Sequence, residues 1–144
     1  MYCHVYPVNT LNNYKYVVVL SRYRGTFLLS RHKQRTTWET QGGHIEPGES
    51  PLAAARRELY EESGAADFSI SYAFDYRAGD DDGYADGAVF IADIRELVPI
   101  PDSEMAEVRC FDHIPPNEQL TYPGITPVLF QYAIQNKLIE WSTP

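Results

Sequence analysis

The chain has 144 residues, of which 44% are hydrophobic and 22% are charged, so it is long enough for one core and too polar for a membrane protein. Its net charge of −8 argues against a general binder of nucleic acid polymers, because such proteins need a broad basic face. An anionic small molecule is not excluded, but it would need a local positive charge such as a divalent cation.

The organisation of the chain favours one domain over residues 1–144, because no repeat, low-complexity tract or linker divides it. Cys3 and Cys110 are too few for a disulfide framework, and no signal-peptide pattern is present. The apolar runs, such as residues 17–20, are far shorter than the ~20 residues of a membrane span. We therefore expect a cytoplasmic protein without a membrane partner.

The first elements along the chain are predicted to form a β-hairpin. Residues 14–20 are aromatic and β-branched, as in a buried strand, and residues 27–30 form a second strand after a turn at residues 23–26. Residues 31–37 follow as a basic loop.

A helix is predicted over residues 51–63. Ser50 is a good N-cap, Pro51 is tolerated in the first turn, and Gly64 fits just past the C-terminal end. The stripe expected to pack on a sheet consists of Leu52, Ala55 and Leu59.

The second half of the chain is predicted to contain three strands and a closing helix. Residues 68–76 alternate with period two, which is typical of a strand. Its apolar face would consist of Phe68, Ile70, Tyr72 and Phe74. The remaining predictions are an acidic loop at residues 79–87, strands at 88–94 and 107–111, an irregular segment at 115–123 and a helix at 125–138. The order of elements indicates a mixed α/β or α+β sandwich.

One face of the predicted helix carries three carboxylates, Glu58, Glu61 and Glu62. Like charges at this spacing repel, and a bound cation would relieve the repulsion. Mg²⁺ and Mn²⁺ take oxygen ligands, usually one or two carboxylates with water and substrate phosphates. An ordinary solvated acidic face is the alternative interpretation.

The residues around this face form a longer pattern. In chain order the pattern is Gly43, Glu49, Arg57-Glu58-Leu59, Glu61-Glu62 and Gly64, closed by Ala65. It resembles the Nudix box, and a chance match at one start position is rarer than ~1 in 10 million. Trp38-Glu39, ahead of Gly42-Gly43, is similar to the lead-in strand of that family. Gln41, where many relatives have Pro, and Ala65, where a larger aliphatic residue is usual, depart from the pattern and concern packing first.

The resemblance implies an α/β/α sandwich around a mixed sheet and a Mg²⁺- or Mn²⁺-dependent hydrolase of phosphoric anhydride bonds. It implies that the metal ligands are Glu58, Glu62, Glu61 and the Gly42 carbonyl. It also implies that Glu49 steadies the site and that Arg57 orients the glutamates by ion pairing.

Hydrolysis needs a base for the proton of the attacking water. Relatives carry this base either on the box helix, here Glu61 or Glu62, or on a glutamate in a later loop. Glu104 is the first candidate in a later loop because it precedes a short strand, as similar loop glutamates do in relatives. Glu107 and Glu118 are weaker candidates. The alternative for Glu104 is an exposed loop charge.

Two groups of residues are candidates for substrate contacts. Arg31, His32, Lys33 and Arg35 form the densest basic patch and could hold phosphates, unless they belong to a solvated loop. Trp38, Phe27, Tyr76 and Tyr122 could stack a base, although aromatic residues are more often in the core. His4, His44 and His113 show no metal-ligand spacing and are interpreted as surface or structural.

The leading functional hypothesis is a pyrophosphohydrolase of nucleoside triphosphates, including oxidised purine deoxynucleotides such as 8-oxo-dGTP. Residues 104–109 and 120–123 resemble relatives with that activity, whose products are a nucleoside monophosphate and pyrophosphate. ADP-ribose or nucleotide-sugar hydrolysis is the alternative within the family, and a non-catalytic nucleotide sensor is the alternative outside catalysis. A small-molecule nucleotide is the expected partner, and relatives often pair as homodimers.

Overall fold

The computed structural model describes residues 1–139 as a seven-stranded sheet with two α-helices and one short 3-10 helix. The strands are β1 Tyr2–Tyr6, β2 Tyr14–Tyr23, β3 Thr26–His32, β4 Gln41–His44, β5 Ala65–Asp80, β6 Gly83–Leu97 and β7 Met105–Phe111. The helices are α1 Pro51–Ser63, η1 Asn117–Gln119 and α2 Thr126–Gln135. In this part of the chain no helix is long and apolar enough to cross a membrane.

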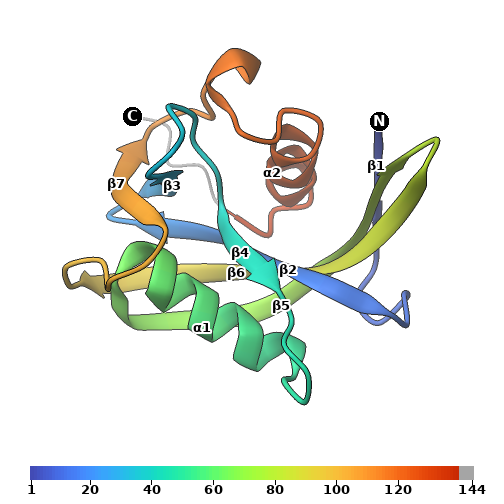
Figure 1. Cartoon of the computed structure of the whole chain (residues 1–144), viewed down its shortest axis with the longest axis horizontal. Helices are drawn as coiled ribbons and strands as arrows, with labels where there is room; N and C mark the ends of the chain where they lie inside the picture. The colour runs from blue at the N-terminus through green and yellow to red at the C-terminus, as the bar shows by residue number, and fades with distance from the viewer. Residues whose placement is uncertain (140–144) are drawn as a thin grey trace.

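The sheet is mixed and is covered by a helix on each face. Its order is β1-β5-β6-β2-β3-β7, with β4 also paired to β2. Strands β2 and β6 are parallel and the other pairs are antiparallel. Helix α1 packs on one side and α2 on the other (Figure 1). The predicted α/β/α sandwich with a mixed sheet is therefore confirmed.

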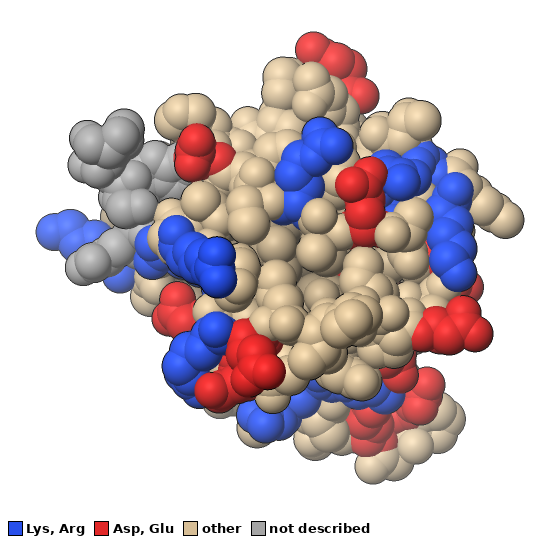
Figure 2. Space-filling view, turned by 90° about the vertical axis from the view of Figure 1, so that its left-hand side faces the viewer, with Lys and Arg blue, Asp and Glu red and all other residues tan. Residues whose placement is uncertain are grey.

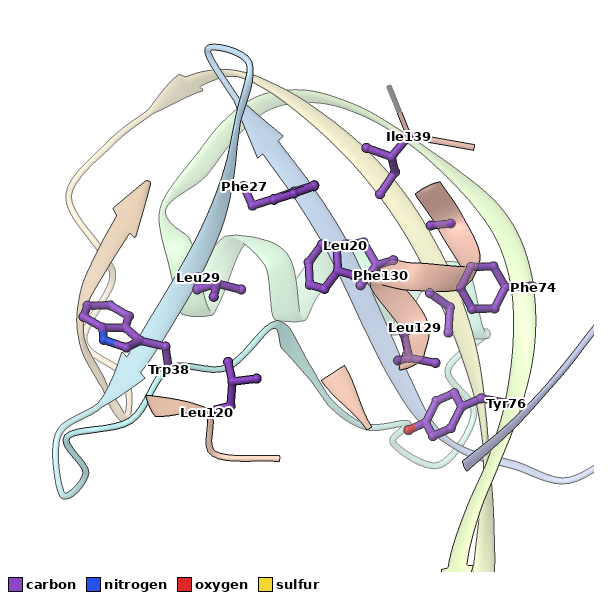
Figure 3. Packing of buried hydrophobic residues seen from close by; sticks show 12 residues of the cluster. Leu20, Phe27, Leu29, Trp38, Phe74, Tyr76, Leu120, Leu129, Phe130 and Ile139 are labelled. Carbon is purple, nitrogen blue, oxygen red and sulfur yellow. The ribbon is translucent and has the colours of Figure 1, made fainter. Parts of the chain in front are cut away.

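The hydrophobic core consists of two clusters, one between each helix and the face of the sheet that it covers. On the α1 side, Val17 and Phe90 pack with Ala55 and Leu59 of the helix. The cluster on the α2 side is shown in Figure 3 and includes Leu20, Phe27, Phe74, Leu129 and Phe130.

Helix α1 has the predicted bounds because the residues that begin and end it act through local hydrogen bonds and backbone conformation. The Ser50 Oγ accepts a hydrogen bond from the Ala53 N–H (3.1 Å), and Gly64 ends the helix with φ of +78°. The predicted packing stripe was wrong at one end. Leu52 in the first turn is 46% exposed, whereas the buried residues are Ala54, Ala55, Leu59 and Ser63.

Strand β5 does not keep its apolar residues on one face, contrary to prediction. A register shift between Tyr72 and Phe74 inserts a β-bulge against β6. Residues before the bulge, including Phe68 and Tyr72, pack on the α1 side, whereas Phe74 and Tyr76 pack on the α2 side. The bulge therefore decides which aromatic side chains face α2.

The predicted acidic loop at residues 79–87 was also wrong. Strands β5 and β6 continue through it as a hairpin, with Asp80 opposite Gly83 and only Asp81 and Asp82 between them. Acidic and glycine residues suggested a loop, but here they lie in a long two-stranded ribbon that pairs with β1 (Figure 1).

Other boundaries changed by a few residues. Strand β1 was not predicted, β2 and β3 are longer than expected, and α2 ends at Gln135 rather than near residue 138. The expected lead-in strand at Trp38-Glu39 consists of two isolated bridges, to Leu120 and Ser30. The regular strand starts only at Gln41.

Candidate functional site

The short strand β4 brings two glycines against the acidic face of α1. The Gly42 N–H donates to Glu62 Oε1 at 2.7 Å. A Cβ added to Gly43 would lie 2.8 Å from Glu58 Oε1, so a side chain there would displace this carboxylate. Glycine at position 43 therefore leaves room for the Glu58 carboxylate beside β4.

Arg57 links four carboxylates at the start of this face. Its guanidinium holds Glu49 with two hydrogen bonds of 2.8 and 2.9 Å. Its Nη1 contacts Glu58 at 2.8 Å and Glu61 at 3.4 Å, and reaches Glu46 at 3.8 Å. The hydrogen bonds from Arg57 lower the pKa of Glu49 to about 2. This is the arrangement that an orienting arginine requires.

Glu62 forms no ion pair with Arg57 and is partly buried. Burial raises its pKa to about 9, and the nearby carboxylates of Glu58, Glu39 and Glu61 add to the rise. The hydrogen bond from Gly42 opposes it. Burial also raises the pKa of Glu58, against the effect of Arg57. Within residues 1–139 Glu62 has no ion pair, so the carboxyl group at this end of the site lacks a cationic partner.

A buried polar network lies behind Glu62 and includes the unusual Gln41, which is fully buried. The Gln41 Nε2 donates to Ser30 Oγ at 2.9 Å, and the Gln41 Oε1 accepts from Ser21 Oγ at 2.6 Å. The Ser30 hydroxyl in turn donates to the Glu62 backbone carbonyl at 2.8 Å. Gln41 thus connects β2, β3 and β4 to the last turn of α1, next to the Glu62 side chain.

A cavity of about 520 Å³ opens beside these residues. Its charged and polar lining consists of His32, Arg35, Glu39, Thr40, Gly42, Gly43, His44, Glu62 and Glu104. The rest of the lining consists of Met1, Tyr16, Val17, Val18, Tyr76, Ala78, Ala85, Met105, Tyr122, Ile125 and Thr126. Its size and its mixed walls are typical of a small-molecule site.

The structure divides the predicted basic patch. Arg35 and Tyr122 line the cavity as expected for substrate contacts, and Arg35 pairs with Glu39 at 3.2 Å. Arg31 and Lys33 do not line it; they pair with Glu107 at 2.8 Å and with Asp102 at 3.9 Å. On the face around β7, Figure 2 shows Lys and Arg interspersed with Asp and Glu. The patch is therefore not one continuous phosphate-binding surface.

Trp38 was predicted to contact substrate, but it belongs to the core. It is 5% exposed, it meets the Phe111 ring edge-on at 5.3 Å, and the Arg109 guanidinium covers its face at 4.7 Å. The Arg109 guanidinium thus occupies a ring face that a nucleobase would need for stacking.

Of the three later base candidates, Glu104 alone lines the cavity. Its Oε2 lies 3.6 Å from His32 Nε2, and its backbone carbonyl accepts from the Lys33 N–H at 2.9 Å. The Nδ1 of His32 accepts from the Gln34 N–H, so a neutral imidazole carries its proton on Nε2, facing Glu104. Glu107 is held by Arg31 instead, and Glu118 lies in the exposed η1.

Sequence reasoning did not place several residues of the cavity, among them Glu39, His44 and Tyr16. Glu39 is 7% exposed and lies near Glu62, whereas the sequence placed it only in the lead-in strand. His44 was interpreted as surface or structural, but it lines the cavity and its ring lies 4.5 Å from that of Tyr16. Tyr16 and His44 are register partners on β2 and β4, a pairing that the sequence does not reveal.

A divalent cation fits the chemistry of this end of the cavity. The donors present are carboxylate and carbonyl oxygens, which Mg²⁺ and Mn²⁺ prefer. The buried Glu62 lacks a cationic partner, and a bound metal would supply one. Among residues 1–139, no three acidic, His or Cys side chains already converge as a complete ligand set. The predicted ligands Glu58, Glu61, Glu62 and Gly42 remain a prediction.

Comparisons with known proteins agree with the fold and the motif. The B. subtilis strain 168 protein named "Putative 8-oxo-dGTP diphosphatase YtkD" is 36% identical over 83 residues. These residues are 58% of this chain and 52% of that protein, so the match spans about half the length of the relative.

Solved structures show the same fold at low sequence identity. The B. subtilis pyrophosphohydrolase BsRppH has a TM-score of 0.81 and 23% identity, covering 97% of this chain and 93% of that one. A Nitrosomonas europaea NUDIX hydrolase has a TM-score of 0.70 and 19% identity, covering 90% and 97%. The NUDIX domain family model matches residues 12–126, most of the chain and the whole box. The chain therefore belongs to the NUDIX domain family.

Proposed function

We propose that this protein is a Mg²⁺- or Mn²⁺-dependent pyrophosphohydrolase of nucleoside triphosphates, with oxidised purine deoxynucleotides such as 8-oxo-dGTP as the favoured class. The observation that carries the proposal is the cavity itself, which has buried carboxylates and glycine backbone in one part and tyrosines in another. Such a cavity suits a ligand with a phosphate chain and a planar ring.

Glu58, Glu61, Glu62 and the Gly42 carbonyl would hold the metal. When bound, the metal would screen the phosphate oxygens and lower the pKa of the attacking water. Arg57 and Glu49 keep the carboxylates of this face in place through the network described above.

Three side chains have direct roles in the proposed reaction. Arg35 provides a positive charge in the cavity for the outer phosphates. The Glu104 carboxylate accepts the proton of the attacking water, and the His32 Nε2–H positions that carboxylate. Water attack on phosphorus then breaks the anhydride bond and releases a nucleoside monophosphate and pyrophosphate.

The choice of substrate is supported by the similarity to the B. subtilis protein named "Putative 8-oxo-dGTP diphosphatase YtkD". ADP-ribose and nucleotide sugars are the competing substrates.

A substrate panel tests the proposal. The chain is incubated with Mg²⁺ or Mn²⁺ and 8-oxo-dGTP, the four dNTPs, ADP-ribose or a UDP-sugar, and the products are separated by chromatography. We expect pyrophosphate and a monophosphate, fastest from 8-oxo-dGTP, and loss of turnover in Glu62→Gln. Preferred cleavage of ADP-ribose or the UDP-sugar would overturn the substrate class. Tight nucleotide binding without turnover would indicate a sensor instead.

A further inference from the structure

Tyr76 places a polar atom in the cavity without a protein partner. The residue is 6% exposed and its ring points inward from β5, below Leu129 of α2 (Figure 3). Its hydroxyl forms no hydrogen bond with any other residue of the described range 1–139. Among the described residues no buried side-chain polar atom lacks a partner, so this hydroxyl is open to the cavity, where it can form a hydrogen bond with a bound ligand.

Two features of the fold direct this side chain to the cavity. The β-bulge between Tyr72 and Phe74 moves Tyr76 to the α2 face of the sheet. Its partner across the sheet is Gly87, where an added Cβ would lie 2.2 Å from Tyr76 Cε1. The ring thus occupies space over β6 that only a glycine leaves open.

The surroundings of Tyr76 form an apolar compartment, here called the aromatic end of the cavity. It consists of Tyr16, Tyr76, Ala78, Ala85, Tyr122 and Ile125. Gly87 also pairs with Tyr16 on β2, so the two tyrosines flank it in one row across the sheet. Next to this row, Ala78 and Ala85 pair across β5 and β6, and their small side chains leave room in the cavity for a flat group.

The carboxylates lie in another part of the same cavity. Glu62 and Gly42 line its acidic end, which is held by β4 and α1. A ligand whose phosphates occupy the acidic end can therefore extend a planar, partly polar group among the tyrosines. A nucleobase has this chemistry, with two flat faces for stacking and hydrogen-bonding atoms at its edge.

We propose that the aromatic end is a base-binding subsite in which the Tyr76 hydroxyl forms a hydrogen bond with the polar edge of the nucleobase. The proposal rests on the proposed function and makes Tyr76 a determinant of substrate specificity. Tyr16 and Tyr122 supply the aromatic surfaces that contact the base.

The test compares Tyr76→Phe with Tyr132→Phe. Each change removes one hydroxyl from a ring of the α2-side core, but Tyr132 does not line the cavity. Steady-state rates are measured with the best nucleotide of the panel and with ribose 5-triphosphate, which has no base. We expect Tyr76→Phe to lower kcat/KM for the nucleotide about 3- to 10-fold, through KM, the range of one lost hydrogen bond. Ribose triphosphate hydrolysis should change less than about 2-fold, and Tyr132→Phe should match the wild type for both substrates.

Unchanged nucleotide kinetics in Tyr76→Phe would overturn the subsite and leave the proposed hydrolase in place. An equal loss with ribose triphosphate would also overturn it, since base recognition cannot affect a base-free substrate. If the wild type hydrolyses no nucleotide, the proposed function fails, and calorimetric titration with the nucleoside decides the subsite. Binding that weakens in Tyr76→Phe alone would support the subsite, and absence of binding would overturn it.

Discussion

The acidic and aromatic ends of the cavity differ in how their residues are distributed along the chain. The acidic end comes from residues 42–62, in which one strand leads directly into α1. The aromatic end combines Tyr16, Tyr76 and Tyr122 from three separate segments. A contiguous helical motif fixes side-chain geometry through helix spacing, whereas the aromatic end depends on strand register and on one bulge.

The largest effect is expected at the acidic end. Glu62→Gln keeps the size of the side chain but removes its charge, so we expect kcat to fall about 100-fold or more while the fold is retained. Stopped assays at saturating Mn²⁺, together with circular dichroism, would measure both quantities. A variant with the wild-type rate would show that Glu62 is not needed for the reaction.

The packing of α1 is tested by Leu59→Ala. Leu59 is fully buried, so its truncation should lower the free energy of unfolding by about 2–5 kcal/mol. Leu52→Ala is the matched control, because Leu52 is 46% exposed and its loss should cost less than about 0.5 kcal/mol. Urea unfolding of both variants gives the comparison, and equal losses would contradict the packing of this helix.

The network behind Glu62 is tested by Gln41→Leu, which leaves Ser21 and Ser30 short of partners. The free energy of unfolding should fall by about 1–3 kcal/mol because buried polar groups become unsatisfied. Mn²⁺ affinity should weaken as well, since Ser30 also holds the Glu62 carbonyl. Urea unfolding and titration of Mn²⁺ would separate the two effects. Loss of stability with unchanged Mn²⁺ affinity would restrict the network to packing.

The difference between Arg35 and Lys33 is a smaller test of the phosphate contacts. Arg35→Ala should raise KM for a nucleoside triphosphate about 10-fold, because its charge lies in the cavity. Lys33→Ala removes an exposed pair with Asp102 and should change KM by less than about 2-fold. Steady-state kinetics of the two variants decides this, and equal effects would restore the continuous basic patch.

The last test is a pH slope in the metal-free protein. The pKa of Glu62 rises from 4.5 to about 9 on folding, so between these values the folded state binds more protons than the unfolded state. The contribution of Glu62 to the free energy of unfolding therefore falls as pH rises through this window. Urea unfolding at pH 5, 7 and 9 should show a steeper decline in the wild type than in Glu62→Gln. Identical slopes would contradict the burial of this charge.

The sequence predicted α1 and its acidic face because Ser50, Pro51 and Gly64 act locally. It offered Tyr76 only as one of four aromatic residues that could stack a base, because the direction of this side chain depends on a bulge against β6. It misplaced Arg31 because the residue that neutralises it, Glu107, lies 76 positions further along the chain. Trp38 was misjudged for a related reason, since its neighbours Phe111 and Arg109 lie on β7. A single sequence thus predicts a helix from local signals, whereas it does not predict contacts between residues that the sheet brings together from distant segments.

Mn²⁺ titration followed by electron paramagnetic resonance tests most directly whether the acidic end binds a divalent metal. The wild type should reduce the free Mn²⁺ signal, and a nucleoside monophosphate should strengthen the binding. Replacement of both Glu58 and Glu62 by Gln should weaken Mn²⁺ binding by at least about 10-fold. Equal Mn²⁺ affinity in the wild type and the double variant would contradict the account.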